Sequence, residues 1–244
     1  MTGEPGAPVG VAPYRGAMLL AEDVLLLLLN DVSGKPLVDT TRLDLALSGA
    51  VMLELASLGR VDVTGPGEQA RPGRLVVRDS TPTGDPILDE ALRRAEVMGP
   101  KKPQSALSGL GKGLRQELLN RLTFRGVLRY EEGRILGLIT THAWPAADLV
   151  HERRVRDALH DVLVVGRTPT STEAALIAVL HAVDQVLKVL GDVGVPKREL
   201  RKRAEAVAAG GFASEAVRKA VEAVTAATVA TIAAVGAAGA AGSS

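Results

Sequence analysis

The sequence predicts a mainly α-helical protein that folds as a single globular multi-helix domain with short β-hairpins. Apolar residues recur at helical intervals along most of the 244-residue chain. Aromatic residues form only 2% of it and hydrophobic residues 46%, so the core must consist of Leu, Val and Ala, which favours helices over a β-sandwich. The length suits one large domain, which we place at residues 18–236.

The two ends of the chain differ in composition from this domain. Residues 1–17 are rich in Gly and Pro with little to bury, and we expect a disordered arm there. Residues 237–244 contain only Ala, Gly and Ser, and we expect a frayed tail.

The stretch AEDVLLLLLND, residues 21–31, contains five consecutive leucines. A transmembrane helix needs about 20 apolar residues, whereas this run stops at Asp31. A secretory signal has basic residues before its apolar run, whereas Glu22 and Asp23 precede this one and suit the first turn of a helix. The pattern therefore predicts a short helix whose leucines are buried in the core.

The elements that follow are predicted from apolar spacing, caps and turn residues. In chain order they are a helix from Thr40 or Thr41 to about Gly59, short strands near 60–63 and 74–78, a helix from Asp85 to Gly99, and a helix that carries a basic stretch to about Phe124. After a hairpin, helices are expected at 147–165, 171–190, 196–209 and 212–235.

The hairpin is predicted within residues 126–141, GVLRYEEGRILGLITT, where two apolar runs flank EEG. Its apolar residues exceed what one face can bury, so we expect a homo-oligomer formed through this hairpin; they are Ile135, Leu136, Leu138 and Ile139. Trp144, the only tryptophan, is expected to fasten the hairpin to the body.

The composition and the motif search argue against an enzyme. The chain has no cysteine, which excludes disulfides and cysteine-type zinc sites and suits a reducing interior. His151 and Glu152 lack a second histidine at metalloprotease spacing, and there is no G-x-S-x-G nucleophile elbow. We therefore expect no catalytic residues, no metal and no cofactor. An enzyme of unrecognised type remains an alternative to the two functions given at the end of this section.

Positive charge is concentrated although the net charge is only +1. Residues 100–129 carry seven basic residues against one acid, Glu117. Within them SGLGKGLR lacks the spacing of a phosphate loop, but it offers backbone N–H groups at a helix start with Lys112 and Arg115 three residues apart. This suits a single phosphate or sulfate; the alternative is a tight glycine connection with two solvated cations.

A second basic run, PKRELRKR at 196–203, is typical of a solvated helix face. No aromatic residue lies near it to stack on a base, and the chain contains no recognisable DNA-binding module. We therefore expect no nucleic-acid partner.

Several segments together resemble the Golgi phosphoprotein 3 family. They are EDVLLLLLND, SGKP, LALSGAVMLELASLGR, DSTPTGDPILDEAL, LRQELLNRLTFRGVL, GLITTHAWP and ALIAVLHAVDQVL. The Ala-, Val- and Arg-rich, cysteine-free composition is typical of a bacterial, actinobacterial relative of that family. The resemblance implies one mostly helical domain, a self-associating hairpin and a basic pocket that grips the phosphate of phosphatidylinositol 4-phosphate.

The resemblance also implies site residues. A pair of family arginines falls on Lys112 and Arg115, which we take as the headgroup-binding or anion-binding residues. A family tryptophan falls near Asp39 and a family arginine on Ser48, so these positions, with Arg121, are expected at the pocket rim. Lysine lacks the bidentate fork of arginine, and the tryptophan and second arginine are missing, so headgroup specificity should be relaxed.

Two functions follow from this resemblance. The first is a cytoplasmic, peripherally membrane-associated adaptor that binds an anionic, phosphoinositide-type lipid headgroup at a membrane surface. The second is a scaffold that binds protein tails without direct lipid recognition.

Overall fold

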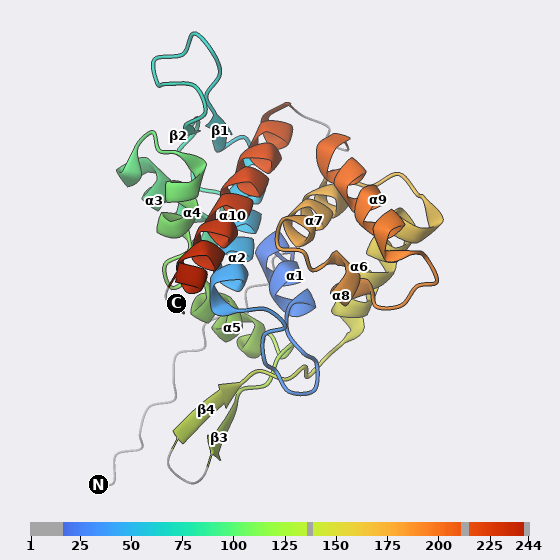
Figure 1. The fold of residues 1–244 in the computed structure, drawn as a ribbon. Coiled ribbons are helices and arrows are strands. Elements are labelled where there is room, and N and C mark those ends of the chain that lie inside the picture. The colour runs from blue at the N-terminus through green and yellow to red at the C-terminus, as the bar shows by residue number, and fades with distance from the viewer. Residues whose placement is uncertain (1–16, 136–138, 211–214, 242–244) are drawn as a thin grey trace, which may run out of the picture.

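The structure is a computed structural model that describes residues 17–135, 139–210 and 215–241. Helices surround the buried α1 and α2, and two small two-stranded sheets lie at the periphery (Figure 1). The predicted mainly α, single-domain fold is confirmed. The expected arm falls almost wholly, at 1–16, outside the described residues, as do residues 242–244 of the expected tail.

Helix α1 (Leu20–Leu27) lies in the core, in contact with α2, α5, α6 and α7. It begins after Leu19, whose backbone N–H donates to the Glu22 carboxylate at 2.8 Å. All five leucines of the run, residues 25–29, are at most 4% exposed. The prediction that they are core residues is therefore confirmed.

Helix α2 (Thr40–Ser57) is buried along most of its length. Its cap is Asp39, which accepts a hydrogen bond from the Arg42 N–H at 3.0 Å, so the expected cap at Thr40 or Thr41 was wrong by a residue or two. All three residue types cap helices well, and the pattern did not distinguish them.

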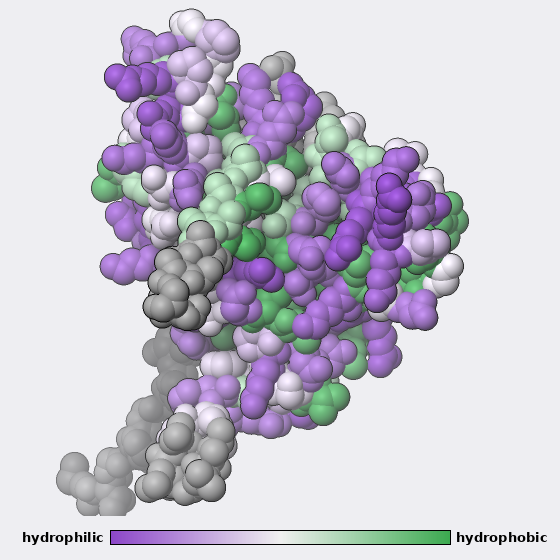
Figure 2. All heavy atoms as spheres, viewed as in Figure 1, coloured by the Kyte–Doolittle hydropathy of each residue, from purple (hydrophilic) through white to green (hydrophobic). Residues whose placement is uncertain are grey.

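The last described helix, α10 (Glu215–Ala241), packs against α2, α4, α7 and β1 and runs past the helix end that was expected near 235. It approaches α2 closely at Gly49, where an added Cβ would lie 2.7 Å from Val224 Cγ1. Part of its exposed side is pale green in Figure 2, where alanines reach the surface, whereas Arg218 and Glu222 are exposed nearer its start. The lack of a side chain at Gly49 thus allows the two helices to approach closely.

The middle of the chain builds the left side of Figure 1. Its elements are β1 (Val61–Val63), β2 (Leu75–Val77), α3 (Pro86–Met98), α4 (Pro103–Leu110) and α5 (Leu114–Phe124). The two strands lie where they were expected and pair antiparallel, with Val61 opposite Val77. The expected basic helix is instead divided into α4 and α5, because the chain turns at Gly111–Gly113 and Gly113 takes φ 77.

The second sheet is the hairpin of β3 (Glu131–Ile135) and β4 (Ile139–Ala143). The expected turn at EEG was wrong: these residues lie in β3, with Gly133 opposite Thr141, and the connection falls at 136–138, outside the described residues. An added Cβ at Gly133 would lie 2.9 Å from Thr141 Oγ1, so this glycine serves cross-strand packing. The residues on which self-association was predicted, Ile135, Leu136, Leu138 and Ile139, lie outside the described side chains.

The remaining helices form the right side of Figure 1. They are α6 (Val150–His160), a π-helical turn (Asp161–Val165), α7 (Ser171–Ala182), α8 (Val186–Leu190) and α9 (Lys197–Gly210). The expected single helix at 171–190 was wrong, because Asp184 takes φ 55 and separates α7 from α8. No helix in the described ranges is long and apolar enough to cross a membrane.

Candidate functional site

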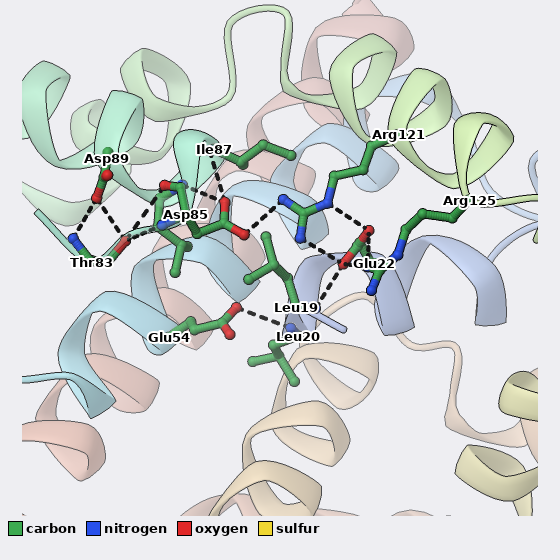
Figure 3. A network of polar contacts seen from close by, with 11 residues as sticks. Leu19, Leu20, Glu22, Glu54, Thr83, Asp85, Ile87, Asp89, Arg121 and Arg125 are labelled. Carbon is green, nitrogen blue, oxygen red and sulfur yellow. Dashed lines mark hydrogen bonds and ion pairs between the residues drawn. The ribbon is translucent and has the colours of Figure 1, made fainter. Parts of the chain in front are cut away.

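Helix α5 and the turn before it bring basic residues into two different surroundings. Arg121 and Arg125 lie inside the fold beside α1 (Figure 3). Arg121 donates from Nη1 to Asp85 Oδ2 at 2.7 Å and pairs through Nε with Glu22 Oε1 at 3.1 Å. Arg125 Nη1 donates to both Glu22 oxygens at 3.2 Å. Glu22 is fully buried, so these arginines neutralise internal acids.

Asp85 and Glu54 extend this network. Besides holding Arg121, Asp85 caps α3 by accepting from the backbone N–H groups of Ile87 and Leu88. Glu54 accepts from the Leu20 N–H at 3.0 Å, and burial raises its pKa to about 7. Figure 3 shows that the network joins α1, α2, α3 and α5. Four segments behind the family resemblance therefore meet here and hold the fold together: EDVLLLLLND, LALSGAVMLELASLGR, DSTPTGDPILDEAL and LRQELLNRLTFRGVL.

Another acid of α1 lies beside a histidine. Asp23 Oδ1 is 2.6 Å from His151 Nε2 of α6. Burial raises the pKa of Asp23, and the contact with His151 partly offsets that rise. His151, examined in the sequence for metal binding, therefore serves a contact between two helices. No set of three or more His, Asp or Glu side chains within the described parts is placed to hold a metal ion.

The turn between α4 and α5 is held in place by two contacts. Arg94 of α3 donates from Nη1 to the carbonyls of Leu110 and Lys112, at 3.2 and 2.6 Å. Below the turn, an added Cβ at Gly111 would lie 2.2 Å from Ser48 Oγ. The backbone of the turn is therefore a tight connection with room only for glycine at this position.

Lys112 and Arg115, the predicted anion-binding pair, both lie on the outside of this turn. Lys112 is exposed beside a shallow cavity of about 540 Å³, which it lines together with Glu90, Arg93 and Arg94 of α3. Arg115 has 36% of its side chain exposed, and its Nε lies 3.5 Å from Asp44 Oδ1. Burial raises the pKa of Asp44, and Arg115 lowers it. The two cations thus share the turn but face α3 and α2, respectively.

The three predicted rim residues are placed differently from one another. Ser48 is 2% exposed beneath the turn and donates to the Asp44 carbonyl at 2.6 Å. Asp39 is exposed, caps α2 and lies 3.4 Å from Arg42 Nε. Arg121 lies between Glu22 and Asp85, with 12% of its side chain exposed. The structure therefore does not bring these residues together with Lys112 and Arg115 around one opening.

Neighbours from α3 were missed by sequence reasoning. Glu90 pairs with both Arg93 and Arg94 at 2.8 Å, and these two guanidiniums lower its pKa to about 2. Arg93 is 61% exposed. The pair of adjacent arginines in LDEALRRAE was the only available signal, and it does not reveal that α3 packs beside the α4–α5 turn.

The surface around the turn is thus basic but contains acids. Lys101 and Lys102, which precede α4, are exposed. Glu90 and Asp44 partly neutralise Arg93, Arg94 and Arg115. Chemically, this surface offers an exposed ammonium and partly exposed guanidiniums to an approaching anion.

A comparison with known protein families supports the resemblance that these segments carry. A model of the family described as Golgi phosphoprotein 3 (GPP34) matches residues 20–224. The match spans the helices from α1 into α10, including every segment that meets in the buried network. The chain therefore belongs to the Golgi phosphoprotein 3 family.

Proposed function

We propose that this protein is a peripheral membrane adaptor that binds anionic lipid headgroups through the surface formed by Lys112 and Arg115. Membership of the Golgi phosphoprotein 3 family is consistent with an adaptor for lipids or proteins. The observation that carries the proposal is the exposure of Lys112. In the described part of the chain, Lys112 forms no ion pair with a carboxylate. Its ammonium is therefore available to a phosphate.

Arg115 supplies the second charge. Its partner Asp44 is 3.5 Å away, and 43% of the Asp44 side chain is exposed. Ion pairs of this exposed kind contribute only about 0–1 kcal/mol. A lipid phosphate, which accepts charge-assisted hydrogen bonds from a guanidinium, can therefore compete with Asp44 for Arg115.

The selectivity of this surface should be low. Ser48 lies beneath Gly111, out of reach of a headgroup, and the Asp39 carboxylate caps its own helix. Neither position supplies a ring or a cation to fix one headgroup. We propose that binding is mainly electrostatic, at about 1 kcal/mol per basic residue near the surface. It should weaken as salt rises, because exposed charges are screened over about 8 Å at physiological ionic strength.

Flotation with liposomes tests this proposal. Vesicles of phosphatidylcholine alone are compared with vesicles that carry equal charge as phosphatidylserine or as phosphatidylinositol 4-phosphate. Lys112→Ala with Arg115→Ala should weaken binding to both anionic vesicles roughly 30-fold, which corresponds to about 2 kcal/mol. Arg198→Ala with Lys202→Ala on α9 removes the same charge from an exposed face elsewhere and should have a much smaller effect.

Three results would contradict the proposal. Equal losses in the two double variants would assign binding to overall charge rather than to the α4–α5 turn. A strong preference for phosphatidylinositol 4-phosphate over phosphatidylserine at equal charge would contradict the low selectivity. Absence of vesicle binding even at low salt would favour the alternative, a scaffold that binds protein tails without lipid recognition.

A further inference from the structure

A second pocket, of about 560 Å³, lies between α5 and the hairpin. Gln116, Asn120, Thr123 and Phe124 of α5 line one side, and Tyr130, His142 and Trp144 of the hairpin line the other. The chain has only five Phe, Tyr and Trp residues, and the three within the described ranges all line this pocket. The buried core is built from aliphatic residues, so the grouping of three aromatic rings at one pocket indicates a specific role for that pocket.

The local structure explains why these side chains converge. The four α5 residues follow helical spacing and share the face opposite the buried Leu118 and Leu122. In the hairpin, Glu131 pairs with Ala143, which places Tyr130 opposite Trp144 at the next position of the ladder. Their ring centroids are 5.6 Å apart. His142 lies two residues before Trp144 and projects from the same face.

The rings form a platform rather than a closed cluster. The Tyr130 hydroxyl is 2.7 Å from His142 Nδ1, the ring planes differ by 19°, and the centroids lie 5.8 Å apart. The two rings are therefore nearly parallel and stacked with an offset that lets the hydroxyl reach the imidazole edge. Trp144 is tilted by 54° to Tyr130 and forms a wall beside it. Tyr130 is 48% and Phe124 62% exposed, so ring surface is open to a ligand.

The polar groups around the platform are neutral donors and acceptors. Gln116 Nε2 donates to Asn120 Oδ1 at 2.8 Å, which leaves Gln116 Oε1 as an acceptor and Asn120 Nδ2 as a donor. The Thr123 hydroxyl donates to the Leu119 carbonyl at 2.8 Å and keeps acceptor capacity. Apart from the histidine, none of the residues that line the pocket is ionisable near neutral pH.

We propose that this pocket binds a neutral pyranose sugar. A pyranose has an apolar C–H face that stacks on an aromatic ring and a rim of hydroxyl groups that both donate and accept hydrogen bonds. The platform and the Gln116, Asn120 and Thr123 side chains match these two features. The pocket volume lies within the range of about 300–1,000 Å³ that is typical of small-molecule sites.

Other ring ligands fit less well. A nucleotide would bring phosphate charge to a pocket lined by neither Lys nor Arg. The arginines adjacent in sequence to lining residues all pair with carboxylates: Arg121 and Arg125 with Glu22, Arg115 with Asp44 and Arg129 with Glu131. A proline-rich peptide also stacks on aromatic side chains, but the rim of this pocket supplies several neutral donors and acceptors, which suit the hydroxyl groups of a sugar. A sugar therefore matches this pocket better than a peptide does, and the titrations below distinguish the two.

The single tryptophan makes the test specific to this site. Trp144 is the only tryptophan in the chain, so its fluorescence reports on this pocket alone. Methyl glycosides of glucose, galactose, mannose and N-acetylglucosamine are titrated to high millimolar concentration, with sorbitol as an acyclic control. At least one glycoside should change the emission saturably, and its stereoisomers should differ in affinity. Sorbitol should have no saturable effect.

Variants then assign the signal to the platform and its rim. Phe124→Ala and Asn120→Ala, both at exposed positions, should each weaken sugar affinity roughly tenfold or more. Leu58→Ala changes a 49% exposed residue outside the pocket and should leave it unchanged. Lys112→Ala with Arg115→Ala should also leave it unchanged, so failure of the lipid proposal would not affect this result.

A vesicle experiment distinguishes the two sources of such a sugar. Uncharged phosphatidylcholine vesicles that contain a monoglycosyl lipid should recruit the protein if the sugar is a glycolipid headgroup. Response to the free glycoside without such recruitment would assign the site to a soluble or protein-linked glycan, and either result supports sugar binding. The proposal is overturned if no glycoside gives a saturable, isomer-dependent change, or if a polyproline peptide gives one and the glycosides do not.

Discussion

The buried arginines of α5 and the exposed cations of the α4–α5 turn lie within a few residues of each other in sequence, yet they have opposite roles. Arg121 and Arg125 are 12% and 16% exposed and bind the fully buried Glu22. Lys112 and Arg115 lie on the surface. The partners of Arg121, Asp85 and Glu22, are 36 and 99 residues away in sequence, so a local count of charge overstates the positive surface.

The comparison is most sharply tested by removing the centre of the buried network. Glu22→Ala should destabilise the protein by about 3–5 kcal/mol, because it leaves two arginines beside α1 without their shared carboxylate. Urea denaturation followed by circular dichroism measures this loss. A loss below about 1 kcal/mol would mean that the network contributes no more than a surface ion pair.

A change of pH should have a smaller effect on the free energy of unfolding than Glu22→Ala. Burial raises the pKa of Glu54 from 4.5 to about 7, so between these values the unfolded state loses a proton that the folded state keeps. This contribution to stability is therefore present below pH 4.5, falls as pH rises to about 7 and stays lost above it.

Glu54→Gln should remove that slope, because a neutral amide retains an acceptor for the Leu20 N–H. Relative to wild type, the variant should gain up to about 3 kcal/mol between acidic and mildly alkaline pH. Denaturation curves over this range measure the difference. Parallel pH profiles for the two proteins would refute the shifted pKa.

The packing beneath the exposed turn can be tested with Gly111→Ala. The added Cβ would lie 2.2 Å from Ser48 Oγ, so we expect a loss of about 1–3 kcal/mol. Ser48→Ala removes that oxygen and should restore part of the stability in the double variant. A double-mutant cycle measures this coupling; losses that simply add would show that the turn does not press on Ser48.

The smallest effect on stability is expected at the exposed cations themselves. Lys112→Ala with Arg115→Ala should change the free energy of unfolding by no more than about 0.5 kcal/mol per residue, because neither side chain is buried. The same denaturation assay as for Glu22→Ala makes the comparison direct. A loss similar to that of Glu22→Ala would place these cations in the structural framework.

Local signals in the sequence predicted the elements that depend on local chemistry. The leucine run predicted the buried α1, and Asp85 with Pro86 predicted the start of α3. The break at Asp184 was missed because VDQ contains no Gly or Pro, the residues that usually mark such a turn, although Asp184 takes φ 55. The hairpin turn was misplaced because Gly133 was interpreted as a turn residue rather than as a strand residue opposite Thr141.

In the candidate site, the sequence also predicted the local features and missed those that depend on tertiary contacts. The spacing of Lys112 and Arg115 identified two neighbouring cations on one turn. Asp44, Arg93 and Arg94 enter the same surface from α2 and α3, through tertiary contacts that no local pattern reports. The aromatic pocket was missed for the same reason: Trp144 was expected to fasten the hairpin, and its neighbours on α5 become visible only when the hairpin is folded.

The close contact between Gly49 and Val224 has a consequence for synthesis of the chain on the ribosome. α2 emerges early, but the side of it that faces α10 stays uncovered until α10 has been translated. The nascent protein therefore carries an apolar helix face through most of its elongation, which is a condition that favours chaperone binding. A ribosome stalled before residue 215 should hold a chain that is more easily cleaved by protease than the released protein.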